Sequence, residues 1–114
     1  MQLLSWTISF FEPGSANLQS ESYPELFNLI SFLKDNPGIS IELDGHTDKL
    51  GDEATMLKLS LDRVTSVENY WVEKGVDTKR IAGKGFGASQ PIAPSDSEEN
   101  RKLNRRVEFK ITKK

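Results

Sequence analysis

The 114-residue sequence contains no cysteine, a single histidine and no long hydrophobic run. Without cysteine, the chain can form no disulfide framework, no thiolate zinc site and no cysteine nucleophile. No apolar stretch approaches the ~20 residues that a membrane-spanning helix needs. Residues 1–6 also lack the basic start and long apolar centre of a signal peptide. If the protein works outside the cytoplasm, we therefore expect this sequence to be a mature form or part of a longer chain.

An excess of charge of either sign is also missing. The 15 Lys and Arg residues stand against 17 Asp and Glu residues, which gives a net charge of −2. Nucleic-acid and anionic-membrane surfaces select for basic proteins, so we expect no nucleic-acid partner. Aromatic and β-branched residues are present, which argues against intrinsic disorder. The length fits one domain over residues 1–114.

Hydrophobic periodicity predicts six elements. Alternating apolar and polar residues predict strands, which we place at residues 3–11, 39–44, 80–86 and 103–111. Apolar residues at helical spacing predict helices, which we place at residues 21–34 and 52–74. The order β-α-β-α-β-β has two connections of helix length, and the last two strands are joined by a predicted loop. We therefore expect an α/β (α+β) sandwich, in which a mixed sheet carries two main helices on one face.

The inner face of the second predicted helix is an apolar stripe. Its members are Leu57, Leu61, Val64, Val67 and Trp71. Arg63 borders this stripe, and its ordinary role would be to pack its aliphatic part there while its charge reaches water.

The loop after the second predicted strand is the first candidate for chemistry. It contains Gly45-His46-Thr47-Asp48, and open α/β sheets bind ligands at the carboxyl ends of their strands. By position alone, Asp48 is more simply a turn or helix-capping residue. His46 has no partners at metal-ligand spacing, so we expect no metal and no cofactor. A turn-stabilising hydrogen bond is the favoured role of His46, since neither Ser60 nor Thr47 is marked as an activated nucleophile.

Two arginines and two glycines in the last third of the chain are further candidates for a site. Arg105 shares a face of the last predicted strand with Val107, so we expect a paired charge or a site edge there. Arg106 is on the other register, where we expect it to be solvated. Gly83 and Gly85 do not open a helix, which favours a close-packed strand end over a phosphate loop.

Several short motifs occur in one family's order. They are Phe10-Phe11-Glu12-Pro13-Gly14-Ser15-Ala16, Gly45-His46-Thr47-Asp48, Leu59-Ser60-Leu61-Asp62-Arg63, Gly85-Phe86-Gly87, Pro91-Ile92 and Asn104-Arg105-Arg106-Val107-Glu108. With this ordered set over nearly its whole length, the sequence resembles the OmpA-like peptidoglycan-binding domain. That family includes the C-terminal domains of OmpA-type outer-membrane proteins, the Pal lipoproteins and the MotB stator proteins.

The resemblance implies a non-catalytic module, not an enzyme. It would bind peptidoglycan through the diaminopimelate of the stem peptide and anchor the outer membrane to the cell wall from the periplasmic side. Membrane contact would come only from a part of the parent protein outside this sequence. In the family, the Asp and Arg at the positions of Asp48 and Arg63 bind diaminopimelate. Asp48 can accept from the ligand's ammonium group, while Arg63 can donate two hydrogen bonds to its carboxylate.

The resemblance also implies a wider set of ligand-binding residues. These are Phe11, Glu12, Gly14, Thr47, Leu50, Met56, Leu59 and Arg105. The family usually has Asn at the position of Met56, so a thioether replaces an amide, and we expect the affinity to change. Two alternatives stay open: a protein-interaction domain whose wall site has decayed, and a peptidoglycan hydrolase that uses His46 and Asp48.

Overall fold

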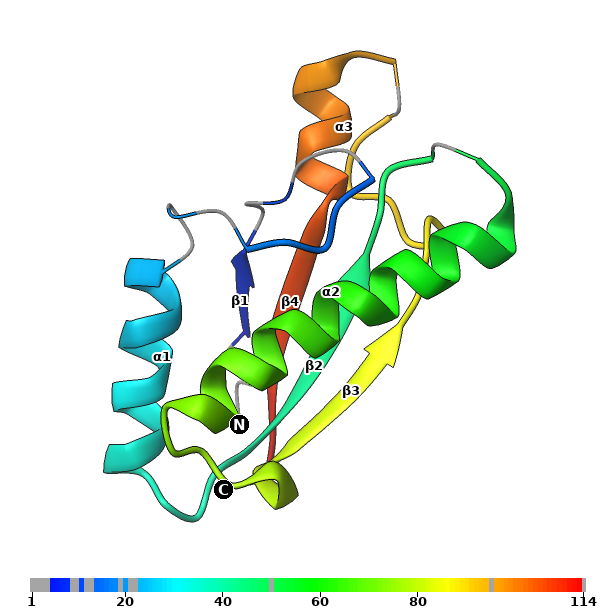
Figure 1. Ribbon diagram of the computed structural model, residues 1–114. Coiled ribbons are helices and arrows are strands. Elements are labelled where there is room, and N and C mark those ends of the chain that lie inside the picture. Colours follow the sequence, from blue (N-terminus) through cyan, green and yellow to red (C-terminus); the bar gives the residue numbers. More distant parts are fainter. Residues whose placement is uncertain are drawn as a thin grey trace.

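The computed structural model contains four strands and three α-helices within its described residues (Figure 1). The structure describes residues 5–8, 11, 14–18, 20, 23–49, 51–94 and 96–113. The strands are β1 (Ser5–Ile8), β2 (Ser40–His46), β3 (Ile81–Gly85) and β4 (Arg106–Lys113). The helices are α1 (Tyr23–Asp35), α2 (Glu53–Glu73), α3 (Glu98–Asn104) and the short 3₁₀ helix η2 (Thr78–Arg80). None of these helices is both long enough and apolar enough to cross a membrane.

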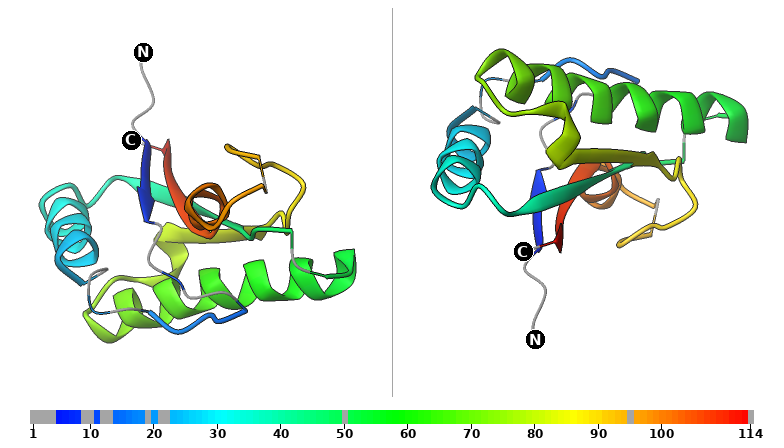
Figure 2. Two further views of the ribbon diagram at one scale, coloured as in Figure 1. Left: turned by 90° about the horizontal axis from the view of Figure 1, so that it is seen from above. Right: turned by 90° about the horizontal axis from the view of Figure 1, so that it is seen from below.

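The sheet is mixed and has the order β1-β4-β2-β3. Strand β4 runs antiparallel to both β1 and β2, whereas β2 and β3 are parallel. Both α1 and α2 lie on the same side of this sheet (Figure 2). The predicted fold class is therefore confirmed. Of the predicted first strand, residues 5–8 form β1, and positions 3, 4, 9 and 10 lie outside the described residues.

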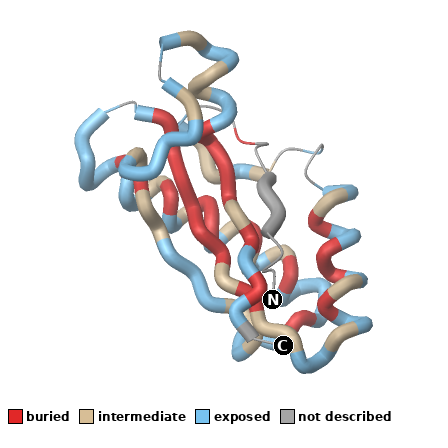
Figure 3. Tube along the Cα trace, turned by 180° about the vertical axis from the view of Figure 1, so that it is seen from behind, coloured by how far each residue is buried: buried red, intermediate tan, exposed pale blue. Residues whose placement is uncertain are grey.

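The core lies between the sheet and its two helices. Side chains such as Leu33 of α1, Leu43 of β2 and Trp71 of α2 are fully buried in it. The two central strands, β2 and β4, are more buried than the edge strand β3 (Figure 3). The Gly45-His46-Thr47-Asp48 motif lies at the C-terminal end of β2, so these buried strands position it.

Helix α2 packs close to the sheet because the strands beneath it carry glycines. A Cβ atom on Gly45 would collide with the backbone carbonyl of Ser60, and one on Gly85 would lie 2.6 Å from the side chain of Leu61. The close-packed strand end that the sequence predicts around Gly83 and Gly85 is thus confirmed. Because α2 approaches so closely, side chains on its lower face are removed from water.

The predicted apolar stripe of α2 is wrong at its N-terminal end. Leu57 and Leu61 are 44% and 43% exposed, while Met56, Ser60 and Arg63 are buried instead. The helix lies over β2 and the edge strand β3, so the side chains that overhang that edge are left partly in water. Residue type therefore predicted the wrong buried face at the N-terminal end of the helix.

Two further local predictions are wrong. Residues 98–104 form α3, not loop and strand, and Ser97 caps this helix by accepting a hydrogen bond from the backbone N–H of Asn100. Strand β4 begins only at Arg106, so Arg105 ends α3. The cap of α2 is Asp52, which accepts from the backbone N–H of Thr55 at 2.8 Å, so the capping role considered for Asp48 is also wrong.

Candidate functional site

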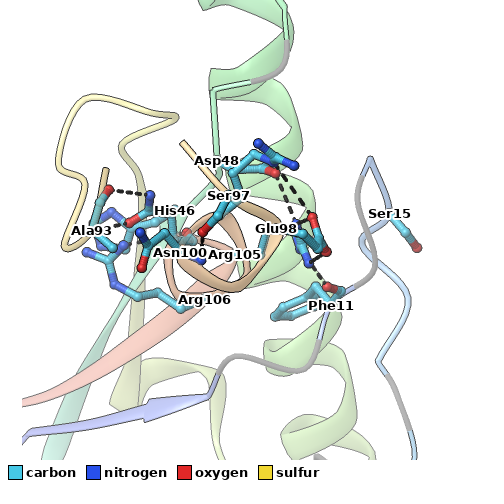
Figure 4. A network of polar contacts seen from close by, with 12 residues as sticks. Phe11, Ser15, His46, Asp48, Ala93, Ser97, Glu98, Asn100, Arg105 and Arg106 are labelled. Atoms are coloured by element: carbon cyan, nitrogen blue, oxygen red, sulfur yellow. Dashed lines mark hydrogen bonds and ion pairs between the residues drawn. The ribbon is translucent and has the colours of Figure 1, made fainter. Parts of the chain in front are cut away.

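Three charged side chains meet where β2 ends and β4 begins. Asp48 follows β2, and Arg105 caps the C-terminal end of α3 (Figure 4). Arg63 lies in the middle of α2. Phe11 and Ser15, from the segment after β1, contact the two arginines. The fold therefore brings together the two residues that the resemblance assigns to the ligand.

Arg105 is the centre of this cluster. Its guanidinium donates to the Oδ2 atom of Asp48 at 3.1 Å, to Glu98 at 2.7 and 3.3 Å, and to the carbonyl oxygen of Phe11 at 3.1 Å. Burial by itself would lower the pKa of Arg105, but its hydrogen bonds with Glu98 and Asp48 raise the pKa overall. The same contact lowers the pKa of the Glu98 carboxyl. The paired charge that the sequence predicts for Arg105 is thus confirmed.

Arg63 is fully buried in α2. It donates to the backbone carbonyls of Ser15 at 2.9 Å and His46 at 3.0 Å, and its guanidinium lies 5.1 Å from the centre of the Phe11 ring. Burial lowers the pKa of Arg63 to about 10, although the nearby charge of Asp48 opposes the shift. A cation in this position is stabilised by any further negative charge that approaches it.

Asp48 is 1% exposed and divides its two oxygens between different environments. The Oδ2 atom accepts from Arg105, whereas the buried Oδ1 atom accepts no hydrogen bond from the described residues. A buried carboxylate oxygen without a donor costs free energy, because it has lost its water. The side chain is therefore able to accept one more donor.

The other predicted ligand residues are not all at this cluster. Thr47 is buried beside it, and its Oγ1 atom has no partner among the described residues. Gly14 is exposed, with a positive φ of 68°, and Leu59 is partly buried on α2. Glu12 and Leu50 lie outside the described residues.

Met56 belongs to a separate cavity. This cavity has a volume of about 450 Å³ and lies between the start of α2 and residues 85–89; neither Asp48 nor Arg63 lines it. The charged cluster itself is closed, because Asp48, Arg63 and Arg105 are each no more than 2% exposed. A ligand would have to replace contacts that Phe11 and Ser15 now make.

The geometry does not support the hydrolase alternative. The Ser60 hydroxyl donates to the Leu57 carbonyl and accepts from the Gly87 backbone N–H, so it is engaged on both sides. Burial and the nearby Arg106 lower the pKa of His46 to about 4, although Glu108 opposes the shift. The His46 ring stacks on Phe86 with a 5.3 Å centroid distance and makes no hydrogen bond with the described residues, so the predicted turn-stabilising bond is wrong.

Sequence reasoning missed several members of the network. Ser15 contacts Arg63 across 48 residues of sequence, and Glu98 contacts Arg105 from seven residues earlier, at the start of α3, which the sequence did not predict as a helix. Arg106, expected to be solvated, is 2% exposed and donates to Glu108 at 2.7 Å and to the Gln90 carbonyl at 2.9 Å. The segment around Gln90 covers this end of the sheet, which is why the outward register is not solvated there.

Comparison with known proteins shows the family to which the chain belongs. Residues 10–105 match the model of the OmpA family. The outer membrane porin F of Pseudomonas aeruginosa is 36% identical over 89% of this chain, and the chain spans only 29% of that protein's length. The crystal structure of the peptidoglycan-associated lipoprotein from Burkholderia pseudomallei has a TM-score of 0.88 at 24% identity, covering 93% of this chain and 89% of that chain. The cell wall anchor of the type VI secretion system (T6SS) from Pseudomonas aeruginosa has a TM-score of 0.81 at 26% identity, covering 98% and 82%.

The chain belongs to the OmpA family. The resemblance drawn from its motifs is thereby confirmed, and the fold is that of the solved Pal and MotB domains. These relatives are envelope and anchoring proteins, so the prediction of a non-enzymatic domain is confirmed as well.

Proposed function

We propose that this domain binds peptidoglycan non-covalently through the diaminopimelate of the stem peptide. Asp48 and Arg63 are the residues that recognise the ligand. The domain then anchors its parent protein, in the outer membrane, to the cell wall from the periplasmic side. Family membership supports the cell-wall partner, and the similarity to an outer-membrane porin supports the location.

The observation that carries the proposal is the meeting of a buried carboxylate with a buried guanidinium. Asp48 retains one oxygen without a donor among the described residues, and the buried guanidinium of Arg63 lies near enough for the two charges to interact. The free end of diaminopimelate offers an ammonium group to Asp48 and a carboxylate to Arg63. Each such charged hydrogen bond contributes ~1.5–3 kcal/mol.

Binding requires the site to open. The Nε atom of Arg63 already donates a hydrogen bond to the carbonyl oxygen of Ser15, and the Phe11 ring lies next to the same guanidinium. In the proposed complex, the ligand carboxylate replaces the Ser15 carbonyl. Arg105 keeps its contacts with Asp48 and Glu98 and so holds the carboxylate in place for the ligand.

Calorimetry with a synthetic stem tripeptide that ends in diaminopimelate tests this function. We expect binding to weaken about 10- to 100-fold in Asp48→Asn and Arg63→Met, because each change removes one charged hydrogen bond. Asp62→Asn and Lys58→Gln, two exposed changes on the same helix, should leave the affinity unaltered. A stem with lysine in place of diaminopimelate should bind poorly, because lysine lacks the carboxylate for Arg63.

One observation favours the protein-interaction alternative: the charged cluster is closed and Asp48 is already paired with Arg105. If the unaltered domain binds the tripeptide no better than Asp48→Asn does, that alternative replaces the proposed function. Circular dichroism melts of each variant separate a loss of binding from a loss of fold.

A further inference from the structure

The cavity of about 450 Å³ is separate from the charged cluster, since Asp48, Arg63 and Arg105 are not among its lining residues. Lys49 and Glu53 line it, and its apolar wall includes Met56, Leu57 and Phe86. Met56 is only 5% exposed, so its thioether forms part of the closed interior of this wall. The cavity thus combines an apolar surface with two side chains of opposite charge.

The two charged residues are available to a ligand. Lys49 and Glu53 are exposed, and the ion pairs found within the described ranges include neither of them. An ammonium and a carboxylate beside one apolar wall fit a small residue at the end of a peptide. Such a residue has an amide N–H to donate, a carboxylate to accept and a short side chain to bury.

We propose that this cavity binds the residue that follows diaminopimelate at the end of the stem, a terminal alanine. Its carboxylate accepts from Lys49, its amide N–H donates to Glu53, and its methyl group packs on Met56 and Leu57. This inference rests on the proposed function, because the charged cluster must hold diaminopimelate for the next residue to be positioned.

The separation of the two sites fits such a ligand. Met56 precedes Arg63 by two helical turns, a rise of about 10 Å. Three methylene groups separate the free end of diaminopimelate from its backbone carbon. Together with the next residue they span on the order of 10 Å. One stem can therefore reach from the Asp48–Arg63 cluster to the cavity.

Calorimetry with three ligands tests the inference: the stem tripeptide, the tetrapeptide that ends in alanine, and the same tetrapeptide with a C-terminal amide. We expect the tetrapeptide to bind about tenfold more tightly than the tripeptide, because methyl burial and an exposed ion pair each add a severalfold gain. The amide should lose the part of this gain that Lys49 provides. Lys49→Gln should remove the same part, and Ala88→Phe, which fills the cavity, should remove the whole gain.

Lys58→Gln is the matched control, since Lys58 is an exposed lysine on α2 outside the cavity. It should keep the full preference for the tetrapeptide. If the tripeptide and tetrapeptide bind the unaltered domain equally, this inference is overturned while the proposed function stands. The same holds if the preference persists in both Lys49→Gln and Ala88→Phe. If neither peptide binds, the proposed function fails and this inference fails with it.

Discussion

Arg105 holds the Asp48 carboxylate at 3.1 Å across 57 residues of sequence, and both side chains are buried. The contact ties the end of α3 to the loop after β2. It also means that the acid assigned to the ligand is positioned by a second arginine, distinct from Arg63. Such a positioned carboxylate keeps its orientation when no ligand is present.

Arg105→Ala should destabilise the domain by ~3 kcal/mol, because it leaves the charge of Asp48 buried without its partner. Urea unfolding followed by circular dichroism measures the change. Arg101→Ala is the control: Arg101 also approaches Glu98, at 3.6 Å, but is 32% exposed and should cost no more than ~0.5 kcal/mol. Equal losses in the two variants would contradict a special role for the Asp48–Arg105 pair.

The stability of the domain should fall in mildly acidic solution because of His46. The ordinary pKa of 6.5 is lowered to about 4 in the folded state, chiefly by burial. Between these values the unfolded chain binds a proton that the folded chain does not, so the free energy of unfolding decreases as the pH falls from 6.5 to 4. After allowance for solvent screening, we expect at most ~1 kcal/mol per pH unit.

His46→Phe isolates this effect, because it retains an aromatic ring to stack on Phe86 and has no titratable group. Its free energy of unfolding should depend less on pH over the same interval, as measured by urea titrations at pH 7, 6, 5 and 4.5. Parallel profiles for the variant and the unaltered domain would assign the acid sensitivity to other groups.

Gly45→Ala should cost at least ~3 kcal/mol, because the added methyl group meets the backbone of α2 at Ser60, which cannot rotate away. Gly83→Ala is a graded comparison on the neighbouring strand. Its methyl group would meet only the side chain of Val64, at 2.6 Å, and the expected cost is ~1 kcal/mol. Thermal unfolding of the two variants side by side measures the difference, and the reverse order would show that α2 shifts more easily than its packing indicates.

Asn104 should be a structural anchor for the segment that covers the end of the sheet. Its Oδ1 atom accepts from the backbone N–H groups of Ile92 and Ala93, at 2.8 and 3.2 Å, and its Nδ2 atom donates to the Ala93 carbonyl at 2.9 Å. Asn104→Ala should cost ~2 kcal/mol and speed hydrogen exchange at Ile92 and Ala93. Asn100→Ala, which removes an exposed bond to Asp96, should leave both quantities nearly unchanged.

Local sequence patterns were sufficient to predict most of the fold. Alternation and helical spacing predicted α1, α2 and β2 to within a few residues, because burial of one face is what those periods report. The ordered motifs were sufficient to predict the family, and the resemblance assigned Asp48 and Arg63 together to the ligand. These conclusions need only the residues themselves, in their order along the chain.

Tertiary structure decided which polar side chains are buried and what they contact. Leu57 and Leu61 are partly exposed because α2 overhangs an edge strand, and Arg106 is covered by a segment that no period predicts. Arg63 and Arg105 each contact a residue far away along the chain, Ser15 at 48 residues and Asp48 at 57 residues. Periodicity carries information about neighbours within a few residues, so contacts made by the meeting of four separate segments exist only in the folded chain.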